Sequence, residues 1–555
     1  MIQKLVTFEG GLSTKIEPHL IGRNEGVICE NVNLESGSLR PLSNFYLETT
    51  ATGKYVHNFE GTFVFNEDAD DDRFYVEYGN RLYWTNAGYG DYGLMRYDGT
   101  NAGVNAEAPN PLNNTQLAYI LINESSSVTG FLTTGASYVY AFTIVDTDGI
   151  ESTPLFKDGV DVVSGKNSME LKITKANMAT LQSAHPDMAG INIYRQGGDN
   201  PTFNLIVESL TPLSDGVTSD ATYYYWHDVT ADIDVSRIEL TTFNNNPPPA
   251  ELDMLIENLG VFWGAVGKNV YFSAGGAPEF WGALDYVSLD EPCTGLGKFA
   301  ESIIAFTRTS AYKIDGYNKD NIVRTKLPFN QGCVNKNTIT NIDAYLVWAS
   351  MNGICIFDGS SIQVVSKKQI AWDEFARVGD LTFEDFGEAK WNSGLGYEIN
   401  YSIGYQDKYF GIFNNGVLVL DLSNGVKFST INLTNVEALM FSKFDNMLYM
   451  IQYNGEDYNV LSYEGARNEP LDAVWKTGRL SDGEGTVQLK HYRDICVDGN
   501  PSSINIYVDN VLRYSVVGKN KFKLPSGLFG KDIQFEITTN NEIRSIKYEY
   551  AVLKM

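Results

Sequence analysis

Short apolar runs separated by glycine-containing turns recur along the chain, and residues 341–366 show this pattern most completely. Apolar segments lie at residues 345–349, 354–357 and 362–365, and the turns Met351-Asn352-Gly353 and Asp358-Gly359 separate them. Glycine accepts the positive φ that tight hairpins need, so the stretch predicts an antiparallel meander of short, buried strands. A single meander of this size is marginally stable and needs neighbours.

Acidic residues that close an apolar strand mark the repeat of this unit. They are Asp98, Asp315, Asp358, Asp421 and Glu464, and the last three intervals are 43, 63 and 43 residues. A four-stranded propeller blade takes about 40–45 residues, so the repeat predicts blades, with an insertion in the longer interval. We interpret Asp315, Asp358 and Asp421 as architectural turn residues, because Asp at a turn bonds its own backbone.

The interval between Asp98 and Asp315 is too long for adjacent blades, and another pattern fills it. Alternating strands at residues 137–145, 168–174, 190–195 and 202–207 predict a small sandwich of the fibronectin or immunoglobulin type. Cleanly alternating strands return near the C-terminus and predict a second sandwich. The expected fold is therefore all-β: a β-propeller interrupted by an inserted fibronectin/Ig-like β-sandwich, with a C-terminal β-sandwich.

The expected domain organisation has five parts. They are an N-terminal extended or assembly segment (1–44), the first propeller strands (45–110), the inserted β-sandwich (117–243), the remaining propeller blades (250–475) and the C-terminal β-sandwich (476–555). Residues 174–189 are the most helix-like stretch between the strands. Proline-rich residues 244–249 form a stiff linker at the end of the inserted domain.

Composition and charge limit the function classes. The chain carries 69 acidic and 42 basic residues, a net charge of −27, which argues against a protein that grips phosphate backbones. Solubility through self-repulsion and a functional acidic surface are both compatible with this charge. Five widely spaced cysteines predict neither a disulfide framework nor a zinc site. No apolar run is long enough to span a membrane, and no signal peptide is expected.

We find no pattern that predicts catalysis or a cofactor. The P-loop, HExxH and GxSxG motifs are absent, and the five histidines stand singly. The run Asp68, Asp70 and Asp72 begins like a calcium loop, but Arg73 replaces the required glycine and Gly79 stands where the bidentate Glu belongs. A solvated hairpin tip is the alternative that these departures favour. We therefore expect neither an enzyme nor a bound cofactor.

The N-terminal residues resemble a known family. They are Gly10-Gly11-Leu12-Ser13, Pro18, Asn31 and Gly37-Ser38-Leu39-Arg40-Pro41. This series is similar to the start of the tail tubular, or nozzle, proteins of short-tailed bacteriophages, which are virion proteins with β-propeller blades. The resemblance implies assembly roles for Gly10, Gly11, Pro18, Asn31, Arg40 and Pro41. It covers some forty residues.

The resemblance implies a structural protein of the virion tail, made in the cytoplasm of the host bacterium. Such a protein assembles as a ring, expected to be a hexamer, on a ring of tail adaptor subunits. It contacts other tail proteins such as fibres or a needle, and it forms the distal conduit for DNA ejection. Double-stranded DNA would pass without sequence-specific binding, and an acidic wall suits that passage because it repels phosphates.

Two other functions remain open at this point. A phage tail module that recognises receptor glycans would need an exposed aromatic pocket. A propeller glycosidase or lyase would need paired carboxylates in a cleft, and the blade-closing acidic residues at turns do not suggest such a pair. The missing motifs make the enzyme the weaker alternative.

Overall fold

In the computed structural model, residues 340–364 form the meander that the sequence predicts. Its three expected strands are confirmed as β30 (Tyr345–Ser350), β31 (Gly353–Phe357) and β32 (Ile362–Val364). A fourth strand, β29 (Thr340–Ile342), precedes them and pairs with β30. The alternating register places Leu346 opposite Phe357 and Trp348 opposite Cys355, and all four side chains are buried.

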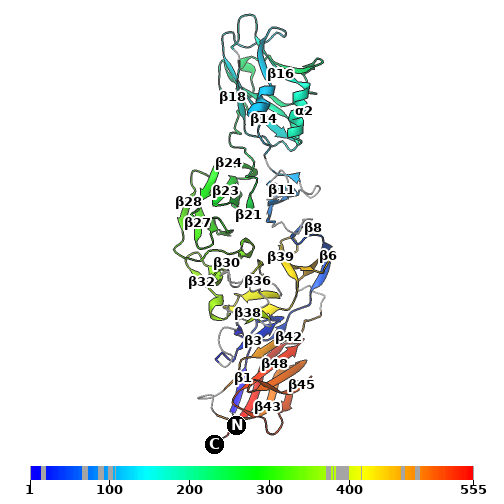
Figure 1. Cartoon of the computed structure of the whole chain (residues 1–555), viewed down its shortest axis with the longest axis vertical. Helices are drawn as coiled ribbons and strands as arrows, with labels where there is room; N and C mark the ends of the chain where they lie inside the picture. Colours follow the sequence, from blue (N-terminus) through cyan, green and yellow to red (C-terminus); the bar gives the residue numbers. More distant parts are fainter. Residues whose placement is uncertain are drawn as a thin grey trace. The chain divides into compact units, whose positions relative to one another are not determined.

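The structure describes most of the chain. The described residues are 2–13, 20–65, 73–85, 93–97, 104–106, 108–159, 161–370, 377–378, 381–382, 399–413, 416–463, 469–481 and 488–553. Strands hold 54% of the residues and helices 5%, in many small sheets, so the all-β class is confirmed. Two compact units are present: Met1–Tyr75 with Leu289–Gly316 and Ile322–Met555, and Val76–Ser288 with Tyr317–Asn321 (Figure 1).

The first unit contains three further four-stranded meanders. Their strands are β25 (Gly295–Phe299), β26 (Ser302–Phe306), β27 (Ala311–Asp315) and β28 (Val323–Lys326); β35 (Tyr401–Tyr405), β36 (Lys408–Phe413), β37 (Gly416–Asp421) and β38 (Lys427–Ile431); and β39 (Val436–Ser442), β40 (Met447–Tyr453), β41 (Tyr458–Ser462) and β6 (Tyr46–Ala51). In the last of these, β6 comes from the start of the chain and pairs with β41, so segments about 400 residues apart complete one sheet.

The second unit contains two meanders of the same kind. One consists of β9 (Tyr75–Tyr78), β10 (Arg81–Thr85), β11 (Leu94–Tyr97) and β12 (Val104–Asn105), and the other of β21 (Asp253–Asn258), β22 (Val261–Val266), β23 (Asn269–Ala274) and β24 (Ala277–Ser288). The repeated meander gives the molecule a propeller-like character. Two-stranded hairpins are β7 (Val56–Phe59) with β8 (Thr62–Phe65) and β33 (Arg377–Val378) with β34 (Leu381–Thr382).

Two four-stranded sheets of the second unit share one core, and we call them the middle sheet pair. One sheet is β13 (Leu121–Ser125), β16 (Ser168–Thr174), β20 (Tyr223–Asp228) and β19 (Thr218–Ser219); the other is β15 (Leu155–Asp158), β14 (Tyr138–Asp146), β17 (Met188–Gly197) and β18 (Asn200–Leu210). Tyr140, Phe142 and Ile193 of one sheet meet Met169 and Leu171 of the other. Helices α1 (Asn114–Tyr119) and α2 (Lys175–Ala184) contact each other. Helix α2 is shorter than the predicted 174–189.

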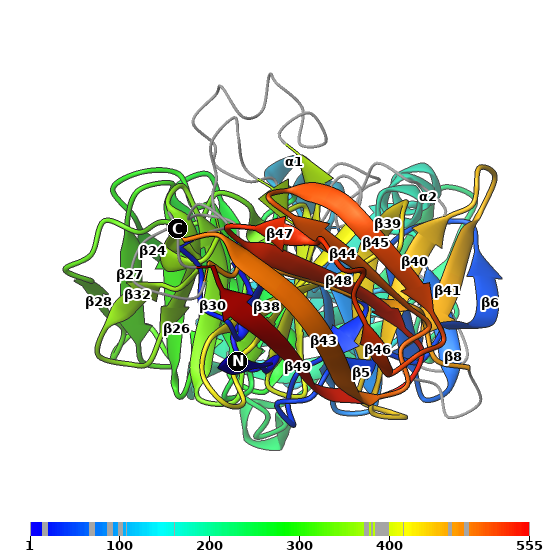
Figure 2. The ribbon, with the colours of Figure 1, turned by 90° about the horizontal axis from the view of Figure 1, so that it is seen from below.

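Two larger sheets hold the C-terminal region, and we call them the terminal sheet pair. One contains β1 (Ile2–Val6), β49 (Ile543–Val552), β43 (Lys490–Gly499), β46 (Lys521–Lys523) and β47 (Phe529–Gly530). The other runs from β42 (Ala473–Thr477) through β48 (Ile533–Thr539) and β44 (Ser503–Val508) to β45 (Val511–Val517). Figure 2 shows β43 and β49 in one layer and β44, β45 and β48 in the other. Both layers contribute to one apolar core.

The N-terminal segment does not stand apart from this region. Strand β1 pairs with β49, from Ile2 opposite Tyr550 to Val6 opposite Ile546. Strand β3 (Glu25–Glu30) lies between β38 and β42, joins their sheets into a ten-stranded one, and also pairs with β2 (Gly11–Leu12). The short strands β4 (Val32–Asn33) and β5 (Arg40–Pro41) pair with each other. The predicted five-part division stays a prediction, but strands β1, β3 and β6 pair with strands from much later in the chain.

The remaining helical turns are single 3-10 turns, η1 (Asp232–Asp234), η2 (Lys336–Thr338) and η3 (Ser366–Lys368). No helix among the described residues is long and apolar enough to cross a membrane.

Candidate functional site

Among the described N-terminal residues that carry the resemblance, several contact strands from later in the chain, and we call these contacts the N-terminal junction. Gly11 has φ +74, and a Cβ there would lie 2.9 Å from the carbonyl oxygen of Phe428. Such a contact is closer than real Cβ atoms allow, and the left-handed conformation itself favours glycine. Gly10 donates its backbone N–H to the carbonyl of Asn24 at 2.7 Å. Only glycine therefore suits this strand crossing at Gly11.

Asn31 is the centre of the junction. Its backbone has φ +54, its N–H donates to the carbonyl of Thr430 at 2.7 Å, and its carbonyl accepts from Leu42 at 2.9 Å. Its side-chain amide donates to the carbonyl of Asp472 at 3.1 Å and accepts from the backbone N–H of Asn432 at 2.9 Å. One side chain thus joins the end of β38 to the start of β42. Asn tolerates this conformation better than other residues with side chains.

Arg40 and Pro41 lie at the edge of the junction. The Arg40 guanidinium contacts Glu542 at 3.3 Å, and the Ser38 hydroxyl donates to the same carboxylate at 2.7 Å. These hydrogen bonds, led by that of Ser38, lower the pKa of Glu542. Pro41 stands opposite Val32 in the β4–β5 pair. Pro18 lies outside the described residues.

Asp421 is buried, and its surroundings are more charged than a turn requires. Its carboxylate accepts from the backbone N–H of Ser423 at 2.9 Å, which is turn chemistry. The register also places it opposite Lys408 and Lys427, two buried lysines. Lys408 bonds the carboxylate of Glu35, and Lys427 donates to the carbonyl of Leu34 at 3.3 Å. The two lysines therefore hold the N-terminal segment against this meander.

The other two blade-closing residues make local bonds. Asp358 accepts from the backbone N–H groups of Ser361 at 2.7 Å and Ser360 at 2.8 Å, and these bonds hold its pKa well below the usual range. Asp315 accepts from the Ser302 hydroxyl at 2.6 Å and from Lys313 at 2.9 Å. Burial alone would raise the pKa of Asp315, but these bonds outweigh it and lower the pKa. Asp98 and Glu464 lie outside the described residues.

Metal ligation was the other chemistry to look for in the described part of the chain. No group of three or more His, Cys, Asp or Glu side chains there is placed to hold a metal ion. The candidate loop with Asp68, Asp70 and Asp72 lies outside the described residues. Burial raises the pKa of the Cys333 and Cys355 thiols to about 12, so neither is a reactive thiolate.

The middle sheet pair holds a buried ionic network that the sequence did not indicate. Arg195 donates to Asp228 at 2.7 Å and to Asp232 at 3.0 Å, and its side chain is fully buried. The hydroxyls of Tyr140 and Tyr138 donate to Asp228 and Asp232, each at 2.9 Å. Desolvation and the neighbouring carboxylate raise the pKa of Tyr140 well above its ordinary value. Buried charges need such partners, so the network is structural.

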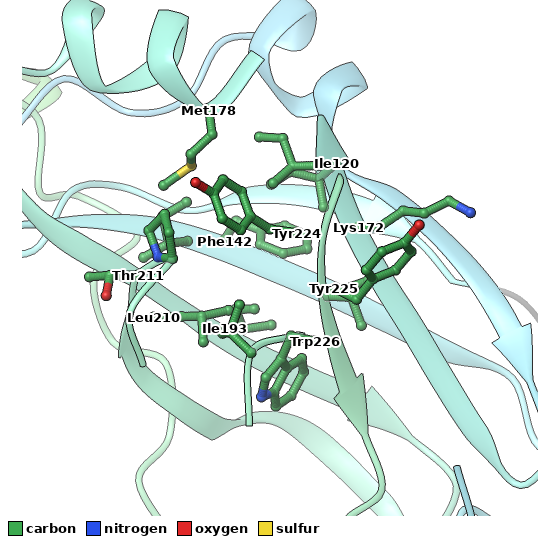
Figure 3. Close-up of a pocket in the computed structure, with 15 residues that line it drawn as sticks. Ile120, Phe142, Lys172, Met178, Ile193, Leu210, Thr211, Tyr224, Tyr225 and Trp226 are labelled. Carbon is green, nitrogen blue, oxygen red and sulfur yellow. The ribbon is translucent and has the colours of Figure 1, made fainter. Parts of the chain in front are cut away.

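An apolar cavity of about 60 Å³ opens beside β20 in the same sheet pair (Figure 3). Successive side chains of a strand point to opposite faces. Tyr224 and Trp226 therefore share one face of β20 and line the cavity, where Tyr224 points toward Met178 of α2. Tyr225 and Lys172, which lie beside each other, are also among the lining residues. Ile120, Leu171 and Leu210 are among the other lining residues. The walls are mainly apolar and offer few hydrogen-bond partners.

The opposite side of β20 carries a row of aromatic and polar side chains, which we call the aromatic face. The rings of Tyr223 and Tyr225 lie 5.9 Å apart, and the Lys172 ammonium lies 5.5 and 5.9 Å from their centres. Glu170 contacts Lys172 at 3.2 Å and His227 at 3.6 Å. The sequence showed the Tyr-rich strand, but the partners of the rings come from β16, which sequence reasoning did not bring together with it.

The hydroxyl of Tyr225 donates to Asp220 at 2.6 Å. This bond raises the pKa of Tyr225 to about 12, and it lowers the pKa of Asp220 to about 2, together with backbone N–H groups of Tyr223 and Thr222. At neutral pH the aromatic face therefore presents a neutral Tyr225 held by an ionised Asp220.

Comparisons with known proteins leave the family open. Neither a model of a known protein family nor a curated protein matches the chain. Among solved structures, the Pan2 WD40 domain of Neurospora crassa aligns at 10% identity over 54% of this chain and 87% of that chain, with a TM-score of 0.23. Apo AztD of Citrobacter koseri aligns at 10% identity over 72% and 98%, with a TM-score of 0.25.

The AfRom2 CNH domain aligns at 8% identity over 75% of this chain and 98% of that chain, with a TM-score of 0.23. These scores are low, so no site and no activity is transferred from these proteins.

Proposed function

We propose that the chain is a structural, non-enzymatic component of a bacteriophage tail. In this proposal it assembles as a ring of six copies in the virion tail, seated on the tail adaptor ring, and forms the distal conduit through which DNA leaves. Fibres or a needle are the further partners. The same proposal includes a closed propeller that β6 completes, an inserted Ig-like sandwich formed by the middle sheet pair, and a C-terminal sandwich formed by the terminal sheet pair.

The observation that carries the proposal is the N-terminal junction. Of the residues that resemble the start of phage nozzle proteins, Gly11 and Asn31 contact β38, Asn31 also bonds Asp472 next to β42, and Arg40 pairs with Glu542 next to β49. Gly10 bonds Asn24 within the N-terminal segment. Three residues of the resembling series therefore lie where the start of the chain contacts segments from far along the sequence. The acidic composition adds support, since 69 acidic residues against 42 basic ones suit a surface along which DNA slides.

The oligomeric state tests this proposal directly. The purified full-length chain, alone and mixed with the other tail proteins, is examined by light scattering coupled to size exclusion and by electron microscopy. A ring with a central opening is expected. A chain that stays monomeric even with its tail partners would refute the proposal, and stable binding to double-stranded DNA at physiological salt would contradict the sliding conduit.

A second candidate function, recognition of a receptor glycan, is favoured by the aromatic face. Tyr223 and Tyr225 are partly exposed, and Glu170, Lys172, His227 and Asp220 supply hydrogen-bonding groups around them. Apolar surface with a few placed polar groups is the usual chemistry of a small-molecule site. The cavity beside Trp226 is not the sugar site in this candidate, because its mainly apolar walls offer few partners to sugar hydroxyls.

A glycan array probed with the full-length chain tests the second candidate. Binding is expected to be lost in a Tyr223→Ala, Tyr225→Ala variant. The matched control is Tyr317→Ala, which removes a tyrosine that is 55% exposed elsewhere. An array without binding, or binding that the double variant retains, would rule the aromatic face out.

A further inference from the structure

The terminal sheet pair ends in an open rim formed by β45 and β46. Strand β45 is the last strand of the ten-stranded sheet, and β46 is the last strand of the other sheet, so among the described residues each has a strand partner on one side only. The two strands follow each other in sequence, and Tyr514 of β45 lies 6.3 Å from Phe522 of β46. We call residues 511–523 the basic rim, because their charged side chains are all basic.

The basic rim has a charge opposite to that of the rest of the chain. Its residues Arg513, Lys519, Lys521 and Lys523 are exposed, and residues 510–530 contain no acidic side chain. Residues 476–555 carry 12 basic and 9 acidic side chains, whereas the whole chain carries 42 and 69. All of the excess negative charge therefore lies outside residues 476–555.

The rim also exposes apolar surface. Val511 is 48% exposed, Leu512 50% and Val517 77%. An edge strand with exposed apolar side chains is a template for pairing with another strand, and a charged residue within it disfavours unsuitable partners. Arg513 lies in the middle of β45, so the strand suits an acidic edge and not a basic one.

An acidic edge of this kind exists on the same chain. Strand β6 is the last strand of the β39–β40–β41–β6 sheet and exposes Tyr46 (42%) and Leu47 (48%) beside Glu48. The other exposed charges of that sheet and its turns are Glu437, Asp445, Glu456 and Asp457 against one Lys443. We call this the acidic edge.

We propose that the basic rim of one copy docks on the acidic edge of a second copy of this chain. The two surfaces match in charge, both present an open strand edge, and both carry exposed apolar side chains. Because they are different surfaces, the contact is head-to-tail, the kind of contact that builds a ring when the rotation between copies closes. The inference rests on the proposed ring and names the surfaces that build it.

Charge reversal with rescue tests the contact. Arg513→Glu with Lys521→Glu is expected to weaken assembly of the full-length chain by about tenfold or more, because like charges then face each other. Glu48→Lys with Glu437→Lys is expected to do the same. All four substitutions in one chain restore the attraction and the assembly. The control Lys268→Glu with Lys319→Glu makes the same change in net charge on exposed turns and leaves assembly unchanged.

Disulfide trapping gives an independent measurement. In a Cys496→Ser background, which removes the exposed cysteine, Leu47→Cys with Val517→Cys is expected to give a ladder of cross-linked oligomers under oxidising conditions. Each single cysteine variant gives none. Leu47→Cys with Leu284→Cys is the control pair, since Leu284 is 81% exposed but lies outside the rim.

The outcomes separate this inference from the proposed function. If the wild-type chain forms rings and the reversals and the trapped pair have no effect, the rim-to-edge contact is overturned and the ring stands. If the wild-type chain remains monomeric with its tail partners, both fail. Restored assembly in the four-substitution chain supports the contact in a way that misfolding of a variant cannot imitate.

Discussion

The middle and terminal sheet pairs are both two layers of antiparallel strands, but they are assembled from very different stretches of chain. Every strand of the middle pair comes from residues 121–228, whereas the terminal pair includes β1 and adjoins β3, about 500 residues before its other strands in sequence. The middle core contains the Arg195 network, and the terminal core is mainly apolar and aromatic, with Phe8 packing edge-on against Trp475 at 5.2 Å. The middle pair is built from one continuous stretch of sequence, whereas the terminal pair needs strand β1 from far away in the chain.

Removing residues 2–51 should produce the largest effect and should separate the two regions. The deletion takes away β1, β3 and β6, so the terminal sheet pair and the β39–β41 sheet lose strands at once. The loss should exceed the whole stability of a typical domain, about 5–15 kcal/mol. Differential scanning calorimetry should show the transition of the middle sheet pair alone. A chain lacking only residues 554–555 is the control, and two intact transitions in the deletion variant would contradict the expectation.

Arg195→Met should destabilise the middle sheet pair by about 3–5 kcal/mol, because Asp228 and Asp232 would be left buried without their cation. Hydrogen exchange should locate the change in residues 121–228 and leave the terminal pair protected. Arg237→Met, which removes an exposed arginine, should stay within about 0.5 kcal/mol of the wild type. Equal effects of the two substitutions would mean that the network adds nothing to stability.

Gly11→Ala should destabilise the N-terminal junction by about 1–3 kcal/mol, from backbone strain and from the contact with Phe428. Gly425→Ala is the matched control, since Gly425 also has positive φ (+96) but a Cβ there meets no atom within 4 Å. The free energies of unfolding of the two variants are measured with urea. Their difference isolates the cost of the close contact between the new Cβ at residue 11 and Phe428. A Gly11→Ala variant as stable as the Gly425→Ala variant would show that the strand crossing can shift.

The smallest expected effect is a pH dependence confined to the terminal pair. Burial opposes ionisation of Glu536, but bonds from Asn505 and Lys476 outweigh it, so its folded pKa is below the ordinary 4.5. The contribution of Glu536 to the free energy of unfolding is therefore complete above pH 4.5, and it is lost as the pH falls through the lower folded pKa. Glu536→Gln should flatten the fall in urea midpoint between neutral and acid pH. An unchanged slope would exclude Glu536 as a source of acid sensitivity.

Patterns within one stretch of sequence predicted structure well, because a hairpin's partner strands are close neighbours in the chain. The meander at residues 340–364 and the strands of the middle pair follow from apolar alternation and glycine turns. The pairing of β6 with β41 and of β1 with β49 was beyond that reasoning, since alternation in one strand says nothing about a partner hundreds of residues away.

The same limit applies to the site residues. Asp358 makes the local turn bonds that its sequence context suggests, but the lysines around Asp421 come from neighbouring strands and hold a segment from the start of the chain. The aromatic face likewise combines β16 and β20, and its pairing register places Lys172 opposite Tyr225. Residue type was visible in the sequence, but the neighbours that determine each residue's role were not.

The pairing of Ile2 with Tyr550 also means that β1 must wait for its partner strand while the chain is synthesised. Translation at about 5–20 residues per second separates the two strands by roughly half a minute to two minutes. The middle sheet pair can fold during that time, because all of its strands emerge together. Strand β1 has no partner until β49 has been synthesised, so slowing translation around residues 543–552, or supplying a chaperone then, should change the yield of this chain more than the same change earlier.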